Sequence, residues 1–180
     1  MSSQRTVSLN GVTYRWPSRP IVVVCIDGGD PAYFDQCLRE GVIPHIQSFM
    51  ENGFSAIAES VVPSLTNPNN MSIVTGSPQS VHGISGNYFL DPDTGAEVMM
   101  NEPEFLRSES VLAMFSRQGA KVVAITAKDK LRRQLGRNLD FAGGSINISS
   151  EKADECTLDE NGIENVLDLV GLPLPEVYSA

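Results

Sequence analysis

The stretch PIVVVCIDGGD, residues 20–30, indicates the type of fold because it reads as a strand buried on both faces. Its apolar run from Ile21 to Ile26 lacks the alternation of apolar and polar residues that a half-exposed strand shows. Continuous apolar runs are typical of parallel sheets, which helices cover on both sides. Asp27 follows the run directly. We therefore expect an α/β sheet with Asp27 at the carboxyl end of a strand.

Two short helices are expected after this strand. Asp30 is suited to cap the first helix, with Pro31 at its first position and Gly41 at its end. The second helix is expected to run from near Pro44 to Gly53. The apolar residues expected on the buried sides of the two helices are Phe34, Cys37, Leu38, Ile46, Phe49 and Met50.

Strands and helices continue to alternate along the chain. Residues 54–62 read as a second strand, and residues 122–126 read as a third strand that follows a helix capped by Ser108 or Ser110. This alternation predicts an α/β fold with a mostly parallel sheet flanked by helices. At 180 residues, the chain suits one compact domain or an incomplete piece of a larger one.

Polar residues follow each of the three expected strands: Asp27, Thr66 and Lys128. The carboxyl ends of parallel strands meet at one edge of a sheet, where such folds place their ligands. With Asn67 as cap and Pro68 in the first turn, Thr66 would lie just outside a helix whose amide groups stabilise anions. A phosphoryl group suits this position. A threonine hydroxyl needs a base or a metal to react, and Asp27 can supply a metal ligand.

Each of these features also has a simpler interpretation. Thr66 can serve only the capping turn, since hydroxyl side chains are common there. Asp27, which precedes Gly28 and Gly29, can be a turn residue. The basic segment KDKLRRQLGR, residues 128–137, is compatible with an anion site and equally with a solvated helix face. The sequence pattern alone leaves these alternatives open.

Composition excludes several classes of partner. A formal net charge of -9 disfavours nucleic acid, whose binding proteins usually carry a positive surface. The run Ile21 to Ile26 is far shorter than the roughly 20 residues of a spanning helix, and the N-terminus lacks the apolar core of a secretory signal. Three cysteines without paired spacing argue against a disulfide framework. We expect a cytoplasmic protein, not bound to a membrane, and leave a homodimer open.

Four blocks of sequence occur in an order that resembles the N-terminal half of the phosphonoacetate hydrolase family, in the alkaline phosphatase superfamily. They are VVVCIDGGDPAYF (22–34), IPHIQSFMENG (43–53), VVPSLTNPNNMSIVTGSPQSVHGISGNYF (61–89) and KVVAITAKDKLRRQL (121–135). The resemblance extends over nearly the whole chain.

The resemblance implies that residues 1–180 are the N-terminal part of a single alkaline-phosphatase-like catalytic domain. It implies a hydrolase with two zinc ions that converts phosphonoacetate to acetate and phosphate. It implies that Thr66 attacks phosphorus and that Asp27 and Thr66 ligate the same zinc ion. Asn87 matches a position that contacts the phosphoryl group. Lys128 and Lys130 match positions that hold the anionic substrate, where their charge would favour the enolate-like charge that develops on the leaving group. The expected partner is thus a small anionic molecule.

The family completes its zinc sites with aspartates and histidines from the second half of the fold. Here the chain has two histidines, and we expect His45 to be a helix-entry residue and His82 to shape the site without binding metal. The chain is therefore expected to be truncated at its C-terminus and inactive by itself. The alternatives are a phosphodiesterase or nucleotide pyrophosphatase of the same superfamily, or an inactive fragment that binds anions.

Overall fold

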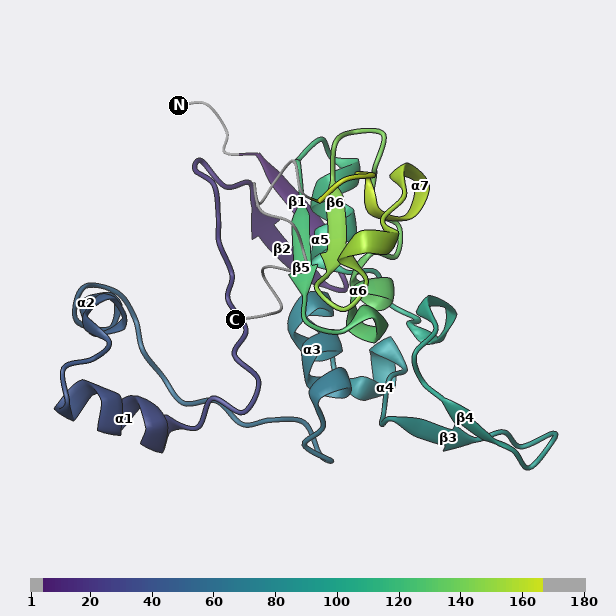
Figure 1. Ribbon diagram of the computed structural model, residues 1–180. Helices are drawn as coiled ribbons and strands as arrows, with labels where there is room; N and C mark the ends of the chain where they lie inside the picture. The colour runs from purple at the N-terminus through teal and green to yellow at the C-terminus, as the bar shows by residue number, and fades with distance from the viewer. Residues whose placement is uncertain (1–4, 167–180) are drawn as a thin grey trace. The chain divides into compact units, whose positions relative to one another are not determined.

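The structure is a computed structural model that describes residues 5–166. It divides into two compact units (Figure 1). Residues Pro17–Ser60 form the first, which we call the helical unit. The residues before and after it form the second, which we call the main unit. Each unit is described by itself.

The helical unit contains the two expected helices, α1 (Pro31–Arg39) and α2 (Pro44–Asn52). Asp30 caps α1 as predicted, since its Oδ1 accepts a hydrogen bond of 2.8 Å from the amide of Ala32. The side chains predicted to lie on the inner face of α1, those of Phe34, Cys37 and Leu38, are half-buried. On α2 the prediction was wrong for Phe49, which is 72% exposed, and for Met50, which is also exposed.

Residues 21–26 lie outside any helix or strand, which corrects the strand expected there. The side chains of Ile21 and Val22 are 71% and 85% exposed. A strand needs a neighbour to satisfy its backbone groups. Within the helical unit the regular elements are the two helices, so residues 21–26 have no strand to pair with there. Residues 54–62 also lie outside strands, for the same reason in the part up to Ser60.

The main unit, in the range that the structure describes, has three two-stranded sheets. Two are antiparallel hairpins, and one has the parallel pairing that the sequence predicts, so the parallel sheet is smaller than expected. The hairpins are β1 (Thr6–Leu9) with β2 (Val12–Arg15) and β3 (Tyr88–Leu90) with β4 (Glu97–Met99); the parallel pair is β5 (Val123–Thr126) with β6 (Ile146–Ser149).

Short helices connect these strands. Ser110 caps α5, since its Oγ accepts a hydrogen bond of 3.1 Å from the amide of Ala113. None of the helices within residues 5–166 is long and apolar enough to cross a membrane. The helices of the main unit are α3 (Thr66–Thr75), α4 (Gln79–His82), η1 (Pro103–Phe105), α5 (Val111–Arg117), α6 (Asp129–Leu135), η2 (Ala153–Glu155) and α7 (Leu158–Asn161).

The core of the main unit joins helices that are far apart in sequence. Met71 of α3 and Met100, which follows β4, are buried in one cluster, and Leu131 and Leu135 of α6 pack against it. Burial of several large apolar side chains, at about 1.5–3 kcal/mol each, is the main term that holds α3 and α6 in one body. The expected site residues on these two helices therefore share a common framework.

Candidate active site

Asp27 lies in a tight turn between the extended residues 21–26 and α1. The amide of Asp30 donates to the carbonyl of Gly28 at 2.9 Å, and Gly28 has a φ of 69°, which glycine adopts without strain. Asp27 belongs to the helical unit, whereas Thr66 belongs to the main unit. That the two residues share one cation stays a prediction.

Thr66 is the first residue of α3, and its side chain is exposed. The residue that caps α3 is Leu65, which corrects the predicted capping role of Asn67. Asn67 lies inside the helix and is 5% exposed. Its side chain is turned inward, where its Nδ2 donates to the backbone carbonyl of Met100 at 3.1 Å. Thr66 therefore lies at the N-terminus of α3, and the residue after it, Asn67, is anchored in the core.

Met100 is a residue that sequence reasoning missed, and its backbone joins three segments that carry predicted site residues. Its carbonyl accepts hydrogen bonds from Asn67 of α3 and from Gln134 of α6, at 3.1 and 2.9 Å. Its amide donates to the carbonyl of Asn87 at 2.8 Å. Asn87 is half-buried and directly precedes β3. A main-chain carbonyl leaves no signal in a sequence, so this junction could be found only from coordinates.

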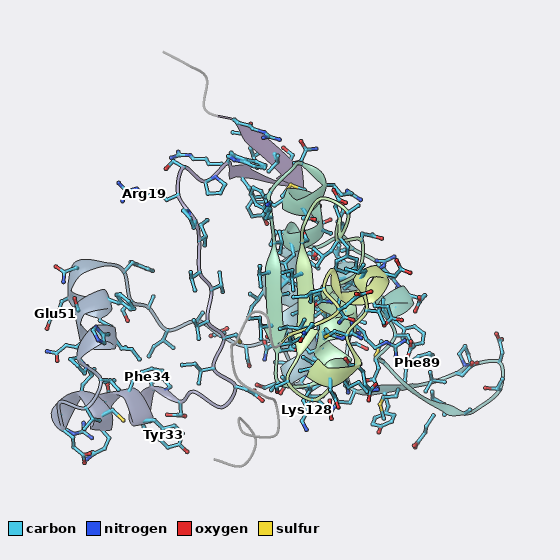
Figure 2. All side chains as sticks on the ribbon, turned by 45° about the horizontal axis from the view of Figure 1, so that its top comes forward. Arg19, Tyr33, Phe34, Glu51, Phe89 and Lys128 are labelled. Atoms are coloured by element: carbon cyan, nitrogen blue, oxygen red, sulfur yellow. The ribbon has the colours of Figure 1, made fainter. Side chains whose placement is uncertain are left out.

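Lys128 follows β5 as predicted, and Lys128 and Lys130 occupy the start of α6. Lys128 is the cap residue, its side chain is 76% exposed, and Lys130 is half-buried in the first turn. Figure 2 shows Lys128 at the end of the main unit toward which the arrows of β5 and β6 point. The hydroxyl of Thr126 donates to the carbonyl of Lys128 at 2.8 Å, so the backbone of this turn is fixed while the lysine side chain extends into solvent.

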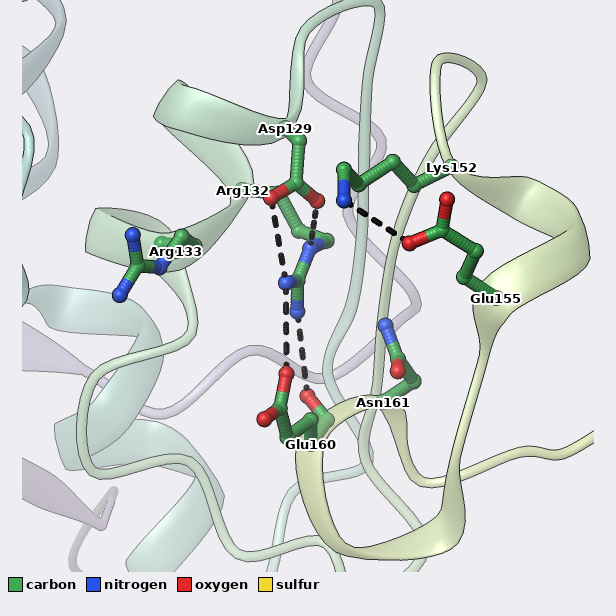
Figure 3. Close-up of a pocket in the computed structure, with 7 residues that line it drawn as sticks. All are labelled: Asp129, Arg132, Arg133, Lys152, Glu155, Glu160 and Asn161. Carbon is green, nitrogen blue, oxygen red and sulfur yellow. Dashed lines mark hydrogen bonds and ion pairs between the residues drawn. The ribbon is translucent and has the colours of Figure 1, made fainter.

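A cluster of charged side chains holds α6 against β6 and α7 (Figure 3). Nε of Arg132 donates to Oδ1 of Asp129 at 2.5 Å, and its Nη2 lies 3.6 Å from a carboxylate oxygen of Glu160. The cluster surrounds a cavity of about 240 Å³. The lining residues are three acids, three bases and one amide: Asp129, Glu155, Glu160, Arg132, Arg133, Lys152 and Asn161.

Each basic side chain of this cluster is paired with a carboxylate. Lys152 pairs with Glu155, and Arg133 pairs with Glu102 outside the cavity. Burial alone would raise the pKa of Asp129, but the hydrogen bond and the charge of Arg132, with help from Ser149 and Lys152, hold that pKa below its ordinary value. The cluster therefore stabilises the helix and does not offer an unpaired charge to a ligand.

The basic segment 128–137 thus separates into residues with different roles. Arg132 is buried in ion pairs, and Arg137 donates to the backbone carbonyl of Leu106. Arg133 is an exposed partner of Glu102. The interpretation as a solvated helix face fits Arg133 and not the other two arginines. Lys128 and Lys130 remain the candidates for an anion ligand.

His45 lies at the entry of a helix as predicted, whereas the role expected for His82 stays a prediction. His45 is the second residue of α2 and is exposed. His82 ends α4, is fully buried, and its Nδ1 accepts a hydrogen bond of 3.1 Å from the amide of Ile84. The ring proton therefore belongs on Nε2, 2.9 Å from the hydroxyl of Ser72. Desolvation lowers the pKa of His82, and in this tautomer it cannot take a proton from Ser72.

The residues that the structure describes do not complete a zinc site. Within residues 5–166 no group of three His, Cys, Asp or Glu side chains comes together as a metal site. Zinc sites usually have three or four protein ligands. The carboxylate of Asp27 can ligate zinc, but Asp27 and Thr66 by themselves are too few ligands for a zinc site.

Comparison with known proteins identifies relatives. The sequence model of the type I phosphodiesterase / nucleotide pyrophosphatase family matches residues 21–154. Two crystal structures of phosphonoacetate hydrolase from Sinorhizobium meliloti 1021, one with phosphonoacetate and one with phosphonoformate, are 48% and 49% identical to this chain, each with a TM-score of 0.91. Each covers 98% of this chain, which spans 43% of that enzyme. The expected alkaline-phosphatase-like α/β fold is confirmed by this likeness.

A more distant relative is an uncharacterized pyrophosphatase/phosphodiesterase of Schizosaccharomyces pombe. It is 35% identical over 85 residues, which are 47% of this chain and 17% of the yeast protein. The chain thus spans less than half the length of each of these relatives.

Proposed function

Because the chain belongs to the type I phosphodiesterase / nucleotide pyrophosphatase family, we propose that it is the N-terminal part of a hydrolase that cleaves the carbon-phosphorus bond of phosphonoacetate. The products would be acetate and phosphate. The observation that supports this proposal best is the 48% identity to phosphonoacetate hydrolase over 98% of the chain. Since the chain spans 43% of that enzyme, the activity is proposed for the full-length enzyme and not for these 180 residues alone.

We assign Thr66 as the nucleophile. Its exposed side chain begins α3, where amide groups and the helix dipole favour a phosphoryl anion. In the proposed step a bond forms between Oγ of Thr66 and phosphorus while the carbon-phosphorus bond breaks. The electron pair of that bond passes to the carbon, which takes a proton to give acetate, and water then releases phosphate from the threonine. We assign Asn87 to the phosphoryl group.

We assign Lys128 and Lys130 to the substrate carboxylate, where their positive charge favours the enolate-like charge on the departing carbon. The exposed ammonium group of Lys128 supports this role, because it can reach a small ligand without a change in the backbone. The nearby buried residue Arg132 already forms ion pairs with Asp129 and Glu160. A small dianion with one carboxylate is therefore the substrate class that this turn favours.

The proposed cofactor is zinc, with two ions in the full-length enzyme. When bound, zinc supplies positive charge that lowers the pKa of a hydroxyl group and stabilises phosphoryl oxygens. We propose Asp27 and Thr66 as ligands of one ion, with the remaining ligands outside residues 5–166. A cytoplasmic location and a homodimer also remain proposals, the location being supported by the odd number of cysteines.

The test is release of phosphate from phosphonoacetate by the full-length enzyme. Thr66→Ala should abolish release, whereas Thr66→Ser, which keeps a hydroxyl, should retain a measurable part of it. Both variants should unfold at the urea concentration of the parent, because the side chain is exposed. An unchanged rate in Thr66→Ala would reject the assignment. The 180-residue chain alone should show no turnover that a chelator removes.

The family match favours a second candidate, a phosphodiesterase or nucleotide pyrophosphatase. The lysine pair argues against it, since an aryl or nucleoside leaving group prefers an apolar surface. Rapid hydrolysis of bis(p-nitrophenyl) phosphate with none of phosphonoacetate would favour this candidate. Binding of phosphonoacetate to the full-length protein without turnover would favour the inactive anion-binding alternative.

A further inference from the structure

We propose that Glu151 is a positioning residue for Lys128 and that the carboxylate of the substrate competes with Glu151 for this lysine. The inference rests on the proposed function, since it takes Lys128 to be the residue that receives the substrate carboxylate. A ligand would then have to pair with Lys128 more strongly than Glu151 does in order to bind.

The backbone places Glu151 beside the lysine turn. Parallel pairing of β5 and β6 continues past both strands, because the amide of Ser150 donates to the carbonyl of Thr126 at 2.8 Å and the amide of Glu151 donates to the carbonyl of Ala127 at 3.2 Å. The hydroxyl of Ser150 also donates to the carbonyl of Ala127, at 3.1 Å. Residue 151 is thus held next to residues 127–129 by main-chain bonds.

The carboxylate of Glu151 makes two contacts of unequal strength. Its Oε2 accepts a hydrogen bond of 2.8 Å from the amide of Asp129, the first residue of α6. Its Oε1 lies 3.7 Å from Nζ of Lys128, beyond hydrogen-bond distance. The first contact is a charge-assisted bond that fixes the turn, and the second is an ion pair between side chains that are 45% and 76% exposed.

An exposed ion pair of this kind contributes little to stability, so a carboxylate ligand can replace it. The replacement leaves the bond to the amide of Asp129 and the backbone position of Lys128 intact, since Thr126 holds the carbonyl of Lys128 separately. Until it is replaced, the negative charge of Glu151 opposes the approach of a second carboxylate to Lys128. Glu151 therefore favours ligands that pair with Lys128 better than it does.

Two substitutions separate the two contacts in the full-length enzyme. Glu151→Gln removes the charge but keeps an oxygen acceptor for the amide of Asp129, and it should lower KM for phosphonoacetate roughly two- to fivefold with kcat unchanged. Glu151→Ala removes the acceptor as well and should raise KM, because the turn that carries Lys128 loses its anchor.

Controls separate a local effect from a general change in charge. Glu155→Gln removes one negative charge from a similar exposed pair, that with Lys152, and should leave KM unchanged. Inhibition by inorganic phosphate, which has no carboxylate, should be equal in the parent and in Glu151→Gln. A KM in Glu151→Gln that is unchanged or raised, or an equal gain in Glu155→Gln, would overturn the proposal.

Binding to the 180-residue chain keeps the inference distinct from the proposed activity. The side-chain NMR signals of Lys128 are followed while phosphonoacetate is added to the parent chain and to Glu151→Gln. A smaller apparent Kd in Glu151→Gln supports the competition even if the full-length enzyme hydrolyses no phosphonoacetate. Equal Kd values, or an absence of any shift at Lys128, overturn it even if that enzyme is active.

Discussion

Asn67 and Gln134 donate hydrogen bonds to the same acceptor, the backbone carbonyl of Met100. Asn67 is next to the proposed nucleophile, and Gln134 lies in the helix that begins after Lys128. Both donors are buried, so neither amide can exchange its partner for bulk water. The first turn of α3 and helix α6 are therefore bonded to one carbonyl that neither helix contains, in addition to the apolar packing that joins them.

Asn67→Ala should lower the free energy of unfolding by about 1–3 kcal/mol, because it removes a buried hydrogen bond and leaves a small void. Urea titration followed by circular dichroism measures this change. The exposed Asn52→Ala, at the end of α2, should change it by less than about 0.5 kcal/mol. Equal effects of the two substitutions would contradict the role of Asn67.

Gln134→Met provides a comparison from the other side of the same carbonyl. Oε1 of Gln134 is buried and has no hydrogen-bond partner within residues 5–166. Methionine fills a similar volume and removes this desolvated oxygen. The stability gained in this way largely offsets the loss of the hydrogen bond that Nε2 of Gln134 donates to Met100. The cost should be about 1 kcal/mol or less. A loss as large as that of Asn67→Ala would show that the oxygen is satisfied in solution.

Stability should fall as the pH falls below about 6.5, the ordinary pKa of histidine. Burial lowers the pKa of His82, so the native state binds fewer protons than the unfolded state in this range, and protonation favours unfolding. Urea titrations between pH 7.5 and pH 5 measure the effect. His82→Gln should reduce this dependence, and the exposed His45→Gln should leave it unchanged. The same dependence in both variants would exclude His82 as its source.

Arg132→Ala should be far more destabilising than Arg133→Ala, although the residues are neighbours. The side chain of Arg132 is 9% exposed and its loss leaves Asp129 without its main partner, which costs about 3–5 kcal/mol. Arg133 makes an exposed pair with Glu102, worth about 0–1 kcal/mol. Thermal unfolding of the two variants is the measurement, and similar melting temperatures would refute the difference.

Lys128→Ala should raise KM for phosphonoacetate more than KM for a simple phosphate monoester in the full-length enzyme. The loss should be about tenfold for the carboxylated substrate, as expected for a hydrogen bond to a charged group. Lys130→Ala is the companion variant. Equal losses for both substrates would make Lys128 a general phosphate contact instead of a carboxylate contact.

Local features of the fold were predictable because they depend on a few adjacent residues. Asp30 and Pro31 specify the start of α1, Ser110 specifies the start of α5, and residues 123–126 form the predicted third strand. Each is a short-range signal, a cap, a fixed proline φ or an apolar run. The position of Lys128 after the third strand follows from the same signals.

Features that depend on distant partners were not predictable. The run Ile21 to Ile26 has the composition of a buried strand, but a strand forms only where a neighbour accepts its hydrogen bonds. Asn67 is a residue type that often caps helices. Its side-chain amide instead donates a hydrogen bond to the carbonyl of Met100, 33 residues away in sequence. The pairing of Lys128 with Glu151 likewise depends on the register of β5 with β6, which the sequence does not specify.

The pairing of β5 and β6 beyond the ends of both strands has a consequence for altering the proposed activity by directed evolution. The bond that attaches residue 151 to Ala127 is made by the main chain, so every substitution except proline keeps it. A library at position 151 would thus vary the charge and size beside Lys128 while the scaffold stays constant. Variants that act on other small carboxylic acids can first be sought by substituting this one position.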